Sequence, residues 1–431
     1  MQPSHRHFCV RPIIVPANAE TEIAIEPLHG HVHLDPTATY EVRGYPCEEF
    51  AQRSGWPEKP LASATVVDGS LRVRCWFEGE QEHVLVVERL EGERRVTVAD
   101  IRVYSLEPDL LARRPYKGDL HIHTNRSDGR ESPAYVAGRA REIGLDFQAI
   151  TDHRRYEPSL EAIAAYEGVE IDLRLFPGEE VHPPRNPIHI INFGGSFSVN
   201  ALFQDADAYA AAVQQVADEL PEPPAGVDPY QYASSTWCFR KIREAGGLGI
   251  FCHPYWFTDH RYTPSGALTS HLFRERPFDA YEVIGGYHLH EADSNTLQVA
   301  RYHDERAEGR THPIVGVSDA HGCDRNELFG WYYTIVFAED GGLPGLIDAV
   351  KGLYSTAVEA LPGQVARAFG PFRLVKYSLF LMREYFPQLD ELCAEEGRLM
   401  LAHAAGDPDA AEALARLHGR TSRLSAELIR R

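Results

Sequence analysis

Two histidines one residue apart begin the stretch of this chain best equipped for chemistry. His121 and His123 flank Ile122 in an alternating segment, which predicts a β-strand with both imidazoles on one face. Asp128 follows in a Ser-Asp-Gly turn, where its carboxylate can fold back over the strand end. Two nitrogen donors and an oxygen donor suit a divalent transition metal such as Zn, Mn or Fe.

Further nitrogen and carboxylate donors recur downstream, and each follows or closes an apolar, strand-like run. They occur in the motifs Thr-Asp-His, Pro-Gly-Glu-Glu, His-Pro and Gly-Val-Ser-Asp-Ala-His, and in one later strand-like segment. A single motif of this kind is a weak signal, but the set is a strong one. The candidate metal ligands are His121, His123, Asp128, His153, Glu180, His189, His253, Asp319 and His321.

The elements that position these donors alternate between strand and helix from residue 117 to 362. Strands are predicted at 147–151, 173–176, 188–193, 248–251, 280–284, 313–317 and 331–337. Helices are predicted at 133–143, 158–167, 206–220, 234–245, 295–308 and 345–352. Repeated units with polar residues at the strand ends predict an α/β fold, a parallel barrel with its site at the C-terminal rim.

The two ends of the chain have different patterns. Residues 1–116 contain short alternating segments separated by turn residues, which predicts a β-rich, sandwich-like domain with 106–116 as the linker. Its histidines His29, His31 and His33 are interpreted as solvent-facing strand residues. Residues 363–431 have helical spacing, which predicts a helical extension that forms an added layer or a surface for a homo-oligomer.

Composition narrows the class of protein. The chain has 431 residues, a net charge of -20 and a mean hydropathy of -0.34. The acidity argues against general nucleic-acid binding, and no apolar run approaches the length needed to span a membrane. Seven scattered cysteines without a Cys-x-x-Cys pair disfavour a disulfide scaffold. The N-terminus does not resemble a signal peptide, so we expect a cytoplasmic protein that acts on a small-molecule substrate.

The order of the motifs resembles that of the PHP (polymerase and histidinol phosphatase) metallohydrolases. The matching residues are His-Ile-His-Thr with Ser-Asp-Gly, Thr-Asp-His at 151–153, Pro-Gly-Glu-Glu at 177–180, His-Pro at 253–254 and Gly-Val-Ser-Asp-Ala-His at 316–321. The resemblance covers roughly 117–360 and implies a distorted seven-stranded (β/α) barrel with two or three divalent metal ions. The added β region resembles the carbaryl-hydrolase-type branch.

The resemblance also implies how the ligands are shared. One ion would be held by His121, His123, Glu180 and Asp319; a second by Asp128, His153 and His321; and the remaining one by His189 and His253 with Glu180 bridging. The family pattern Gly-x-Glu selects Glu180 over Glu179, although the other alignment stays open. His182 competes with His189, because it lies two residues past Glu180.

Three functions fit these residues. In the first, a metal-dependent phosphoesterase, a metal-bound hydroxide held by the ligands attacks phosphorus. The second uses the same hydroxide on a carboxylic ester, carbamate or amide, and the third is a binding module, which intact ligands at every motif disfavour. Residues proposed as substrate contacts are Arg126, Arg154, Arg155 and Arg185 as phosphate clamps, His288 and His290 for substrate contact or proton transfer, and the aromatic residues Tyr255, Trp256, Phe257 and Tyr262.

Overall fold

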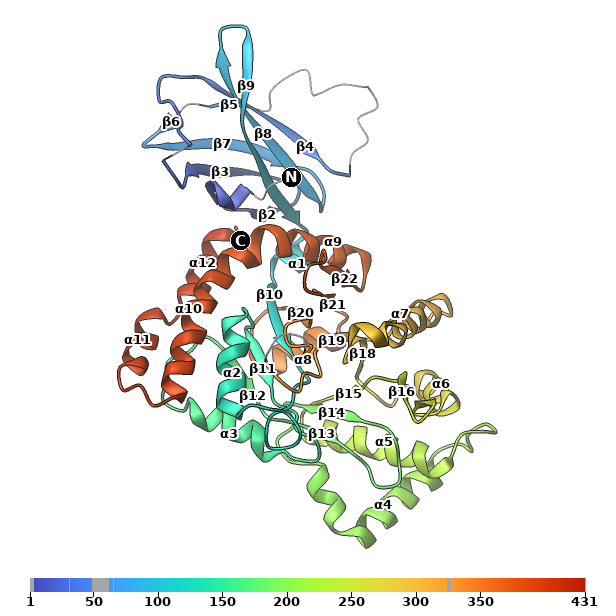
Figure 1. Cartoon of the computed structure of the whole chain (residues 1–431). Coiled ribbons are helices and arrows are strands. Elements are labelled where there is room, and N and C mark those ends of the chain that lie inside the picture. The colour runs from blue at the N-terminus through green and yellow to red at the C-terminus, as the bar shows by residue number, and fades with distance from the viewer. Residues whose placement is uncertain (1–3, 31, 49–61, 65, 324–326, 431) are drawn as a thin grey trace. The chain divides into compact units, whose positions relative to one another are not determined.

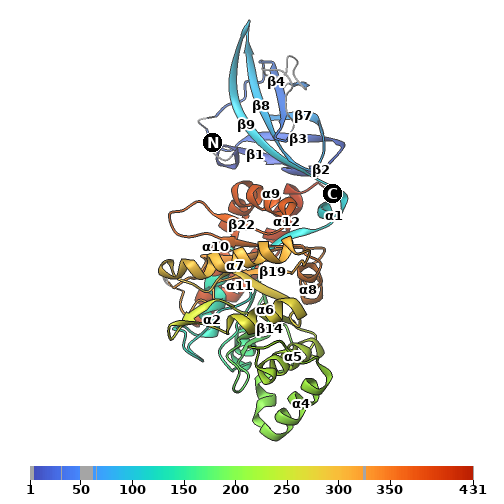
Figure 2. The ribbon, with the colours of Figure 1, turned by 90° about the vertical axis from the view of Figure 1, so that its right-hand side faces the viewer.

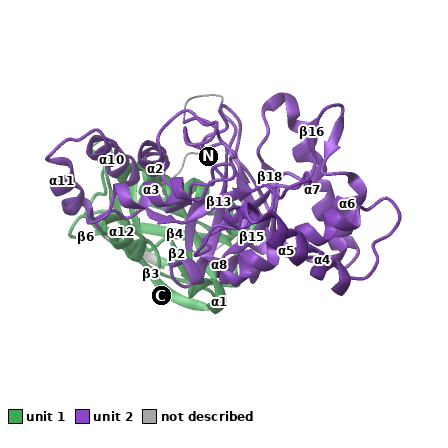
Figure 3. Ribbon diagram, turned by 90° about the horizontal axis from the view of Figure 1, so that it is seen from below, with its two compact units in different colours: residues 1–114, 375–392, 419–431 green, residues 115–374, 393–418 purple. Residues whose placement is uncertain are grey.

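The computed structural model describes the chain except residues 1–3, 31, 49–61, 65, 324–326 and 431. The chain divides into two compact units, coloured separately in Figure 3. Unit 1 contains 1–114, 375–392 and 419–431, and unit 2 contains 115–374 and 393–418. The sequence predicts three consecutive parts, whereas the segment after residue 363 contributes to both units of the structure.

Unit 1 contains two β-sheets. The four-stranded sheet has the order β1 (Phe8–Arg11), β3 (Ala19–Pro27), β7 (Ser70–Phe77) and β6 (Val66–Val67). The five-stranded sheet has the order β2 (Ile14–Pro16), β9 (Arg94–Leu106), β8 (Glu82–Glu91), β4 (Tyr40–Pro46) and β5 (Ala62–Ala64). In β7, Leu71, Val73, Cys75 and Phe77 are buried and the residues between them are exposed, as the alternating pattern predicts.

Helical segments of both ends complete unit 1. The short helices η1 (Ser4–Arg6) and α1 (Pro108–Leu111) flank the strands, and α12 (Arg420–Leu428) ends where Ile429 bridges to Ile14 of β2. The segment 106–116, expected as a linker, holds α1 and the start of β10. Among the described residues, no helix is long and apolar enough to cross a membrane.

Unit 2 contains two larger sheets, whose strands are labelled in Figure 1, and a two-stranded hairpin. The six-stranded sheet has the order β12 (Arg174–Phe176), β11 (Phe147–Ala149), β10 (Arg114–Asp119), β20 (Tyr332–Ala338), β21 (Ser355–Glu359) and β22 (Arg367–Phe369). The five-stranded sheet has the order β13 (Gly178–Val181), β14 (Ile190–Phe193), β15 (Leu248–Phe251), β18 (Ala280–Gly285) and β19 (Ile314–Val317).

The strands of unit 2 are not all parallel, contrary to expectation. Parallel pairs join β10, β11 and β12, and join β15, β18 and β19, but β14 runs antiparallel to both of its neighbours. The connection from β13 to β14 is too short for a crossover helix, so the chain must turn back. The strands β20, β21 and β22 are also antiparallel to one another, and the connection from β21 to β22 is likewise short. The fold is therefore mixed α/β, and the single seven-stranded barrel stays a prediction.

Helices follow most strands of unit 2. They are α2 (Pro133–Glu142), α3 (Glu157–Ala165), η2 (Asn200–Gln204), α4 (Ala206–Glu219), α5 (Pro229–Glu244), α6 (Gly266–Glu275), η3 (Leu289–Glu291), α7 (Ala292–Ala307), α8 (Leu343–Lys351) and α11 (Ala410–Leu417). Helices α4 and α5 lie side by side in both views (Figures 1 and 2). The remaining C-terminal elements are α9 (Phe372–Phe380), the π-helical turn η4 (Leu381–Tyr385) and α10 (Phe386–Ala404), whose residues are divided between the two units.

Two local differences from the predicted elements bear on the candidate site. The strand expected through 119–123 ends at Asp119, and beyond it only Ile122 pairs, as an isolated bridge with Ala320. The aromatic loop after His253 is a hairpin of β16 (Trp256–Thr258) and β17 (Arg261–Thr263). Its turn residues Asp259 and His260 have positive φ angles, which suit a tight hairpin turn.

Candidate metal centre

All of the predicted metal ligands come together at the ends of strands in unit 2. His121, His123 and Asp128 follow β10, His153 follows β11, Glu180 lies on β13, and His189 precedes β14. His253 follows β15, and both Asp319 and His321 follow β19. Their donor atoms form overlapping groups in which all atoms lie within 4.8 Å of one another. These groups are His123, Asp128, His153 and His321; His121, His123 and Asp319; His153, Glu180 and His182; and Glu180, His189 and His253.

Glu180 lies at the centre of this cluster of donors. Its carboxylate is fully buried and is surrounded by imidazole nitrogens. Besides a close contact with His153, the distances are 2.8 Å to His189 Nδ1, 3.3 Å to His182 Nε2, 3.5 Å to His253 Nε2, 3.6 Å to His123 Nε2 and 3.7 Å to His121 Nε2. A buried carboxylate facing so many nitrogen donors is a bridging position for cations.

Orphaned polar atoms test whether a metal fits. Both oxygens of Glu180 are buried without a hydrogen bond among the described residues, as is the Nδ1 atom of His189, which faces Glu180 Oε1. Leaving a buried charged group without a hydrogen bond costs several kcal/mol, so native proteins rarely tolerate it. Divalent cations bound among these atoms would satisfy them together, because imidazole nitrogens and carboxylate oxygens are the donors that Zn, Mn and Fe accept.

A second group gathers around the predicted turn. Asp128 Oδ2 lies 3.3 Å from His153 Nε2, and Asp128 Oδ1 lies 3.4 Å from His321 Nε2. The His321 Nδ1 atom lies 2.9 Å from the carbonyl oxygen of Asp319. That contact fits a tautomer in which Nδ1–H donates to the carbonyl and the Nε2 lone pair faces Asp128. His123 also belongs to this group, so it lies between two sets of donors.

The turn that carries Asp128 is held by Asp152, the middle residue of the Thr-Asp-His motif. Asp152 is fully buried and accepts hydrogen bonds from the backbone N–H and hydroxyl groups of both Thr124 and Ser127, at 2.6 to 3.0 Å. Gly129 closes the turn, and a Cβ atom there would lie 2.8 Å from the backbone of His123. Asp152 therefore shapes the loop, although it is not one of the grouped donors.

A second buried carboxylate ties two ligand-bearing strand ends together. Asp119 accepts hydrogen bonds from the hydroxyl and backbone N–H groups of Ser318 and from the His121 backbone N–H. Burial raises the pKa of Asp119 to about 6 in spite of these hydrogen bonds. The residue after Ser318 is Asp319, whose backbone has a left-handed conformation with φ of 50°. Strained backbone of this kind persists only where surrounding contacts impose it.

Electrostatics in the cluster favours added positive charge. Burial lowers the pKa of His121, but the carboxylates of Asp319, Glu282 and Glu180 outweigh it and raise that pKa well above its ordinary value. Burial raises the pKa of Glu180, but the imidazoles of His189 and His121 outweigh it and hold that pKa well below its ordinary value. Protons or metal ions must therefore compensate the buried carboxylates, and they compete for the same nitrogens.

The structure separates the two neighbouring glutamates on β13. The Glu179 carboxylate accepts hydrogen bonds from Asn192, Ser198 and the Val199–Asn200 backbone, on the side of the strand away from the histidines. Glu180 faces the histidines instead. His182 and His189 both approach Glu180, with ring centroids 3.9 Å apart, so this geometry brings both into the cluster.

The predicted arginine clamps lie elsewhere. Arg126 pairs with Glu161 at 2.6 Å, and the Arg185 guanidinium lies 4.3 Å from the centre of the Tyr230 ring. Arg154 and Arg155 are exposed and do not line the cavity over the centre. Of the two candidate histidines, His288 lines this cavity and His290 does not.

The cavity over the donors has a volume of about 510 Å³. Beside the predicted ligands, its wall contains Trp256, Tyr287, His288, Glu291 and Leu328. The Trp256 ring lies 5.7 Å from the His189 ring and 5.8 Å from the His253 ring, measured between centroids. Of the four aromatic residues predicted after His253, Trp256 lines this cavity, whereas Tyr255, Phe257 and Tyr262 do not.

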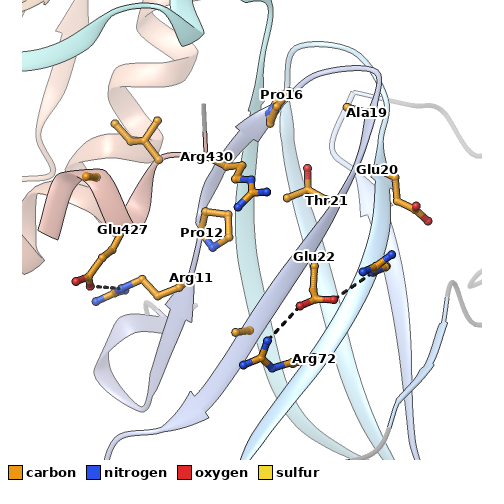
Figure 4. Close-up of a pocket in the computed structure, with 14 residues that line it drawn as sticks. Arg11, Pro12, Pro16, Ala19, Glu20, Thr21, Glu22, Arg72, Glu427 and Arg430 are labelled. Carbon is orange, nitrogen blue, oxygen red and sulfur yellow. Dashed lines mark hydrogen bonds and ion pairs between the residues drawn. The ribbon is translucent and has the colours of Figure 1, made fainter. Parts of the chain in front are cut away.

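A wider cavity, of about 710 Å³, lies in unit 1 (Figure 4). Its charged side chains largely neutralise one another: Arg11 pairs with Glu427 at 3.4 Å, and Glu22 pairs with both Arg72 and Arg74. These are exposed ion pairs on a sheet surface, which contribute little energy and carry no catalytic grouping. Size alone therefore does not identify the site.

Sequence reasoning missed two buried residues beside the centre. Glu282 and Cys252 form a further donor group with His121, and Glu282 Oε1 lies 2.7 Å from His121 Nδ1. Glu282 lies within the apolar strand β18 rather than at its end, so the search for donors at strand ends passed over it. The sequence did contain one signal for Glu282, because a carboxylate within a run of apolar residues is rarely buried without a partner.

Comparisons with known proteins give no match among family models or among curated proteins. Solved structures similar to this chain include a two-domain protein of Bacteroides vulgatus containing a predicted PHP-like metal-dependent phosphoesterase. It is 19% identical, with 63% of this chain and 71% of that chain covered and a TM-score of 0.45. An amidohydrolase of Chromobacterium violaceum with bound sulfate and no metal is 19% identical, with 49% and 89% covered and a TM-score of 0.31.

A chain from Bifidobacterium adolescentis, described as a candidate metal-dependent phosphoesterase, is 21% identical, with 48% and 89% covered and a TM-score of 0.33. The PHP name suggested by the motifs is thus also the name given to the first of these neighbours. Since the TM-scores are below 0.5, the case for a metal centre rests on the geometry of this chain.

Proposed function

We propose that this chain is a metal-dependent phosphoesterase that hydrolyses a small phosphorylated molecule at a centre of two or three divalent ions. The observation that carries the proposal is Glu180, whose two buried oxygens make no hydrogen bond and face imidazole donors on several strands. A solvated or purely structural carboxylate has no need of that surrounding. Two of the similar solved structures carry the name of this class of activity, and a third is named an amidohydrolase.

The donors divide among the ions by proximity. His121, His123 and Asp319 with Glu180 would hold one Zn, Mn or Fe ion; Asp128, His153 and His321 a second; and His189 and His253, again with Glu180, the remaining one. The observed donor groups support this division, with His123 close to the second group as well. His182 would supplement or replace His189.

The chemistry needs little else from the protein. Bound divalent ions lower the pKa of water toward neutrality and neutralise charge that develops on a phosphoryl oxygen. The chain itself fixes the ligand geometry through Asp119 and Asp152, encloses the substrate within the cavity, and places Trp256 and Tyr287 beside the reacting group. The His288 ring at the cavity wall would contact the substrate or transfer a proton.

We assign the proposed barrel to seven strands: β10, β11, β13, β14, β15, β18 and β19. Two isolated bridges support this ring, because Ile122 pairs with Ala320 between β10 and β19, and His153 pairs with Glu180 between β11 and β13. Each bridge lies beside predicted ligands. The ring would thus be closed where the metal centre needs its strand ends to converge.

A carboxylic ester, carbamate or amide hydrolase is the second candidate. The aromatic wall favours it, because Trp256 can stack on the aryl or acyl part of such a substrate. The predicted arginine clamps Arg154 and Arg155 do not line the cavity, which weakens one argument for phosphate.

A side-by-side hydrolysis assay distinguishes the two candidates. The Mn- or Zn-reconstituted chain is tested on aryl phosphate mono- and diesters and on aryl acetates and carbamates, with Asp319→Asn as the blank. Turnover of phosphate esters that the blank lacks supports the proposal. Turnover confined to the carbonyl esters would replace it with the second candidate, and no turnover of any substrate above the blank would count against both.

A further inference from the structure

Glu282 makes two hydrogen bonds that reach two different strand ends of the centre. Its Oε1 atom lies 2.7 Å from His121 Nδ1, and its Oε2 atom accepts a hydrogen bond of 2.8 Å from the backbone N–H of His253. The side chain is fully buried, on a strand between two fully buried residues, Tyr281 and Val283. One carboxylate therefore contacts two of the predicted ligands.

We propose that Glu282 is a positioning residue that orients His121 and His253 for metal binding; this inference rests on the proposed metal centre. When Nδ1–H of His121 donates to the carboxylate, the Nε2 atom carries the lone pair. That Nε2 atom lies 3.1 Å from Asp319 Oδ1 and 3.7 Å from Glu180 Oε2, where the ion would bind. Carboxylates that hold metal-binding imidazoles in this way typically raise metal affinity 10- to 100-fold.

The second hydrogen bond stabilises an unusual backbone conformation. His253 has a positive φ of 21° and precedes Pro254, so its backbone is restricted from both sides. A buried, charge-assisted hydrogen bond to its N–H group offsets part of that strain. With this bond in place, His253 Nε2 lies 3.5 Å from Glu180 Oε1.

The experiment compares the full-length wild-type chain with Glu282→Gln and Glu282→Asp. The amide of Gln keeps the shape but can accept only one of the two hydrogen bonds, and Asp keeps the charge but has too short a reach. The control is Glu305→Gln, which alters another buried glutamate that contacts a histidine, His312, outside the centre. Bound Zn is counted by mass spectrometry after dialysis, affinity is measured by chelator competition, and Co-substituted protein gives a visible spectrum.

We expect both Glu282 variants to lose 10- to 100-fold in affinity for the ions held through His121 and His253, to keep the ion held by Asp128, His153 and His321, and to change the Co spectrum. Glu305→Gln should lower the unfolding midpoint without altering metal binding. Wild-type affinity and spectrum in Glu282→Gln or in Glu282→Asp would overturn the positioning role while leaving the proposed function intact. A wild-type chain that binds no Zn would overturn both.

Discussion

The Nε2 atoms of His121 and His123 lie 3.1 Å apart, and each lies within 3.1 Å of Asp319 Oδ1. The three atoms come from the ends of two strands that are far apart in the sequence. Three potential electron-pair donors at such short range repel one another unless a proton or a cation lies among them. A cation bound within this triangle would relieve that repulsion.

Trp256 should determine preference for aromatic substrates. Removing its ring in Trp256→Ala should lower kcat/KM for aryl esters by about 5-fold and change that for methyl esters much less, because ring stacking is worth roughly 1 kcal/mol. The matched control is Phe257→Ala, since Phe257 is 55% exposed and does not line the cavity. Equal losses on both substrates, or an equal effect of the control, would contradict the assignment.

Asp152 should be needed for the ion nearest Asp128. In Asp152→Asn the amide cannot accept all four hydrogen bonds from Thr124 and Ser127, so the turn should lose its shape. We expect about one bound metal ion fewer per chain and a loss of roughly 1 to 3 kcal/mol in unfolding free energy. Elemental analysis and urea unfolding measure these quantities. Unchanged metal content would show that the turn is held by other contacts.

The buried pair of Arg141 and Glu396 should stabilise unit 2. Arg141 is fully buried, and its Nε donates to Glu396 Oε2 at 2.7 Å. Glu396→Ala leaves that guanidinium with less compensation, so unfolding free energy should fall by about 3 kcal/mol. Adding Arg141→Met should recover part of the loss, because the uncompensated charge is then removed as well. A double variant no more stable than the single one would contradict this explanation.

Buried His83 in β8 should make unit 1 sensitive to acid. Burial lowers the pKa of His83 to about 4, from an ordinary value near 6.5. The unfolded chain therefore binds this proton more readily than the folded chain, and stability falls as pH drops from about 6.5 toward 4. Between pH 7 and 5 the loss should be about 2 kcal/mol.

Urea unfolding of the full chain at both pH values measures this dependence. His83→Gln should show a smaller loss between pH 7 and 5 than the wild-type chain. The control His33→Gln changes an exposed histidine and should show the wild-type dependence. An identical pH dependence in His83→Gln would contradict the role of His83.

Much of the donor cluster could be predicted because its members follow strands. His153, His253 and Asp319 each come directly after an apolar run, and the carboxyl ends of neighbouring strands meet at one edge. Glu282 could not be found in this way, because it lies inside the apolar strand β18 rather than after its end. The separation of Glu179 from Glu180 likewise depends on which face of β13 points inward.

The topology was harder to predict than the elements. The segment 248–251 is a strand as predicted, but pattern alone does not give the direction of a neighbour such as β14. The short connection from β13 to β14 makes the chain turn back, which decides the direction of β14. Arg126 illustrates the same difficulty for single charges, because its ion pair with Glu161 depends on how a turn and a helix meet in space.

The most direct test of the account is the metal content of Asp319→Asn and His123→Ala beside the wild-type chain. We expect two or three bound divalent ions in the wild-type chain and at least one fewer in each variant. Hydrolysis by each variant should be reduced by at least about 100-fold. His303→Ala, which changes an exposed histidine on α7, should behave as the wild-type chain does. Full metal occupancy with undiminished hydrolysis in Asp319→Asn or His123→Ala would contradict the proposed centre.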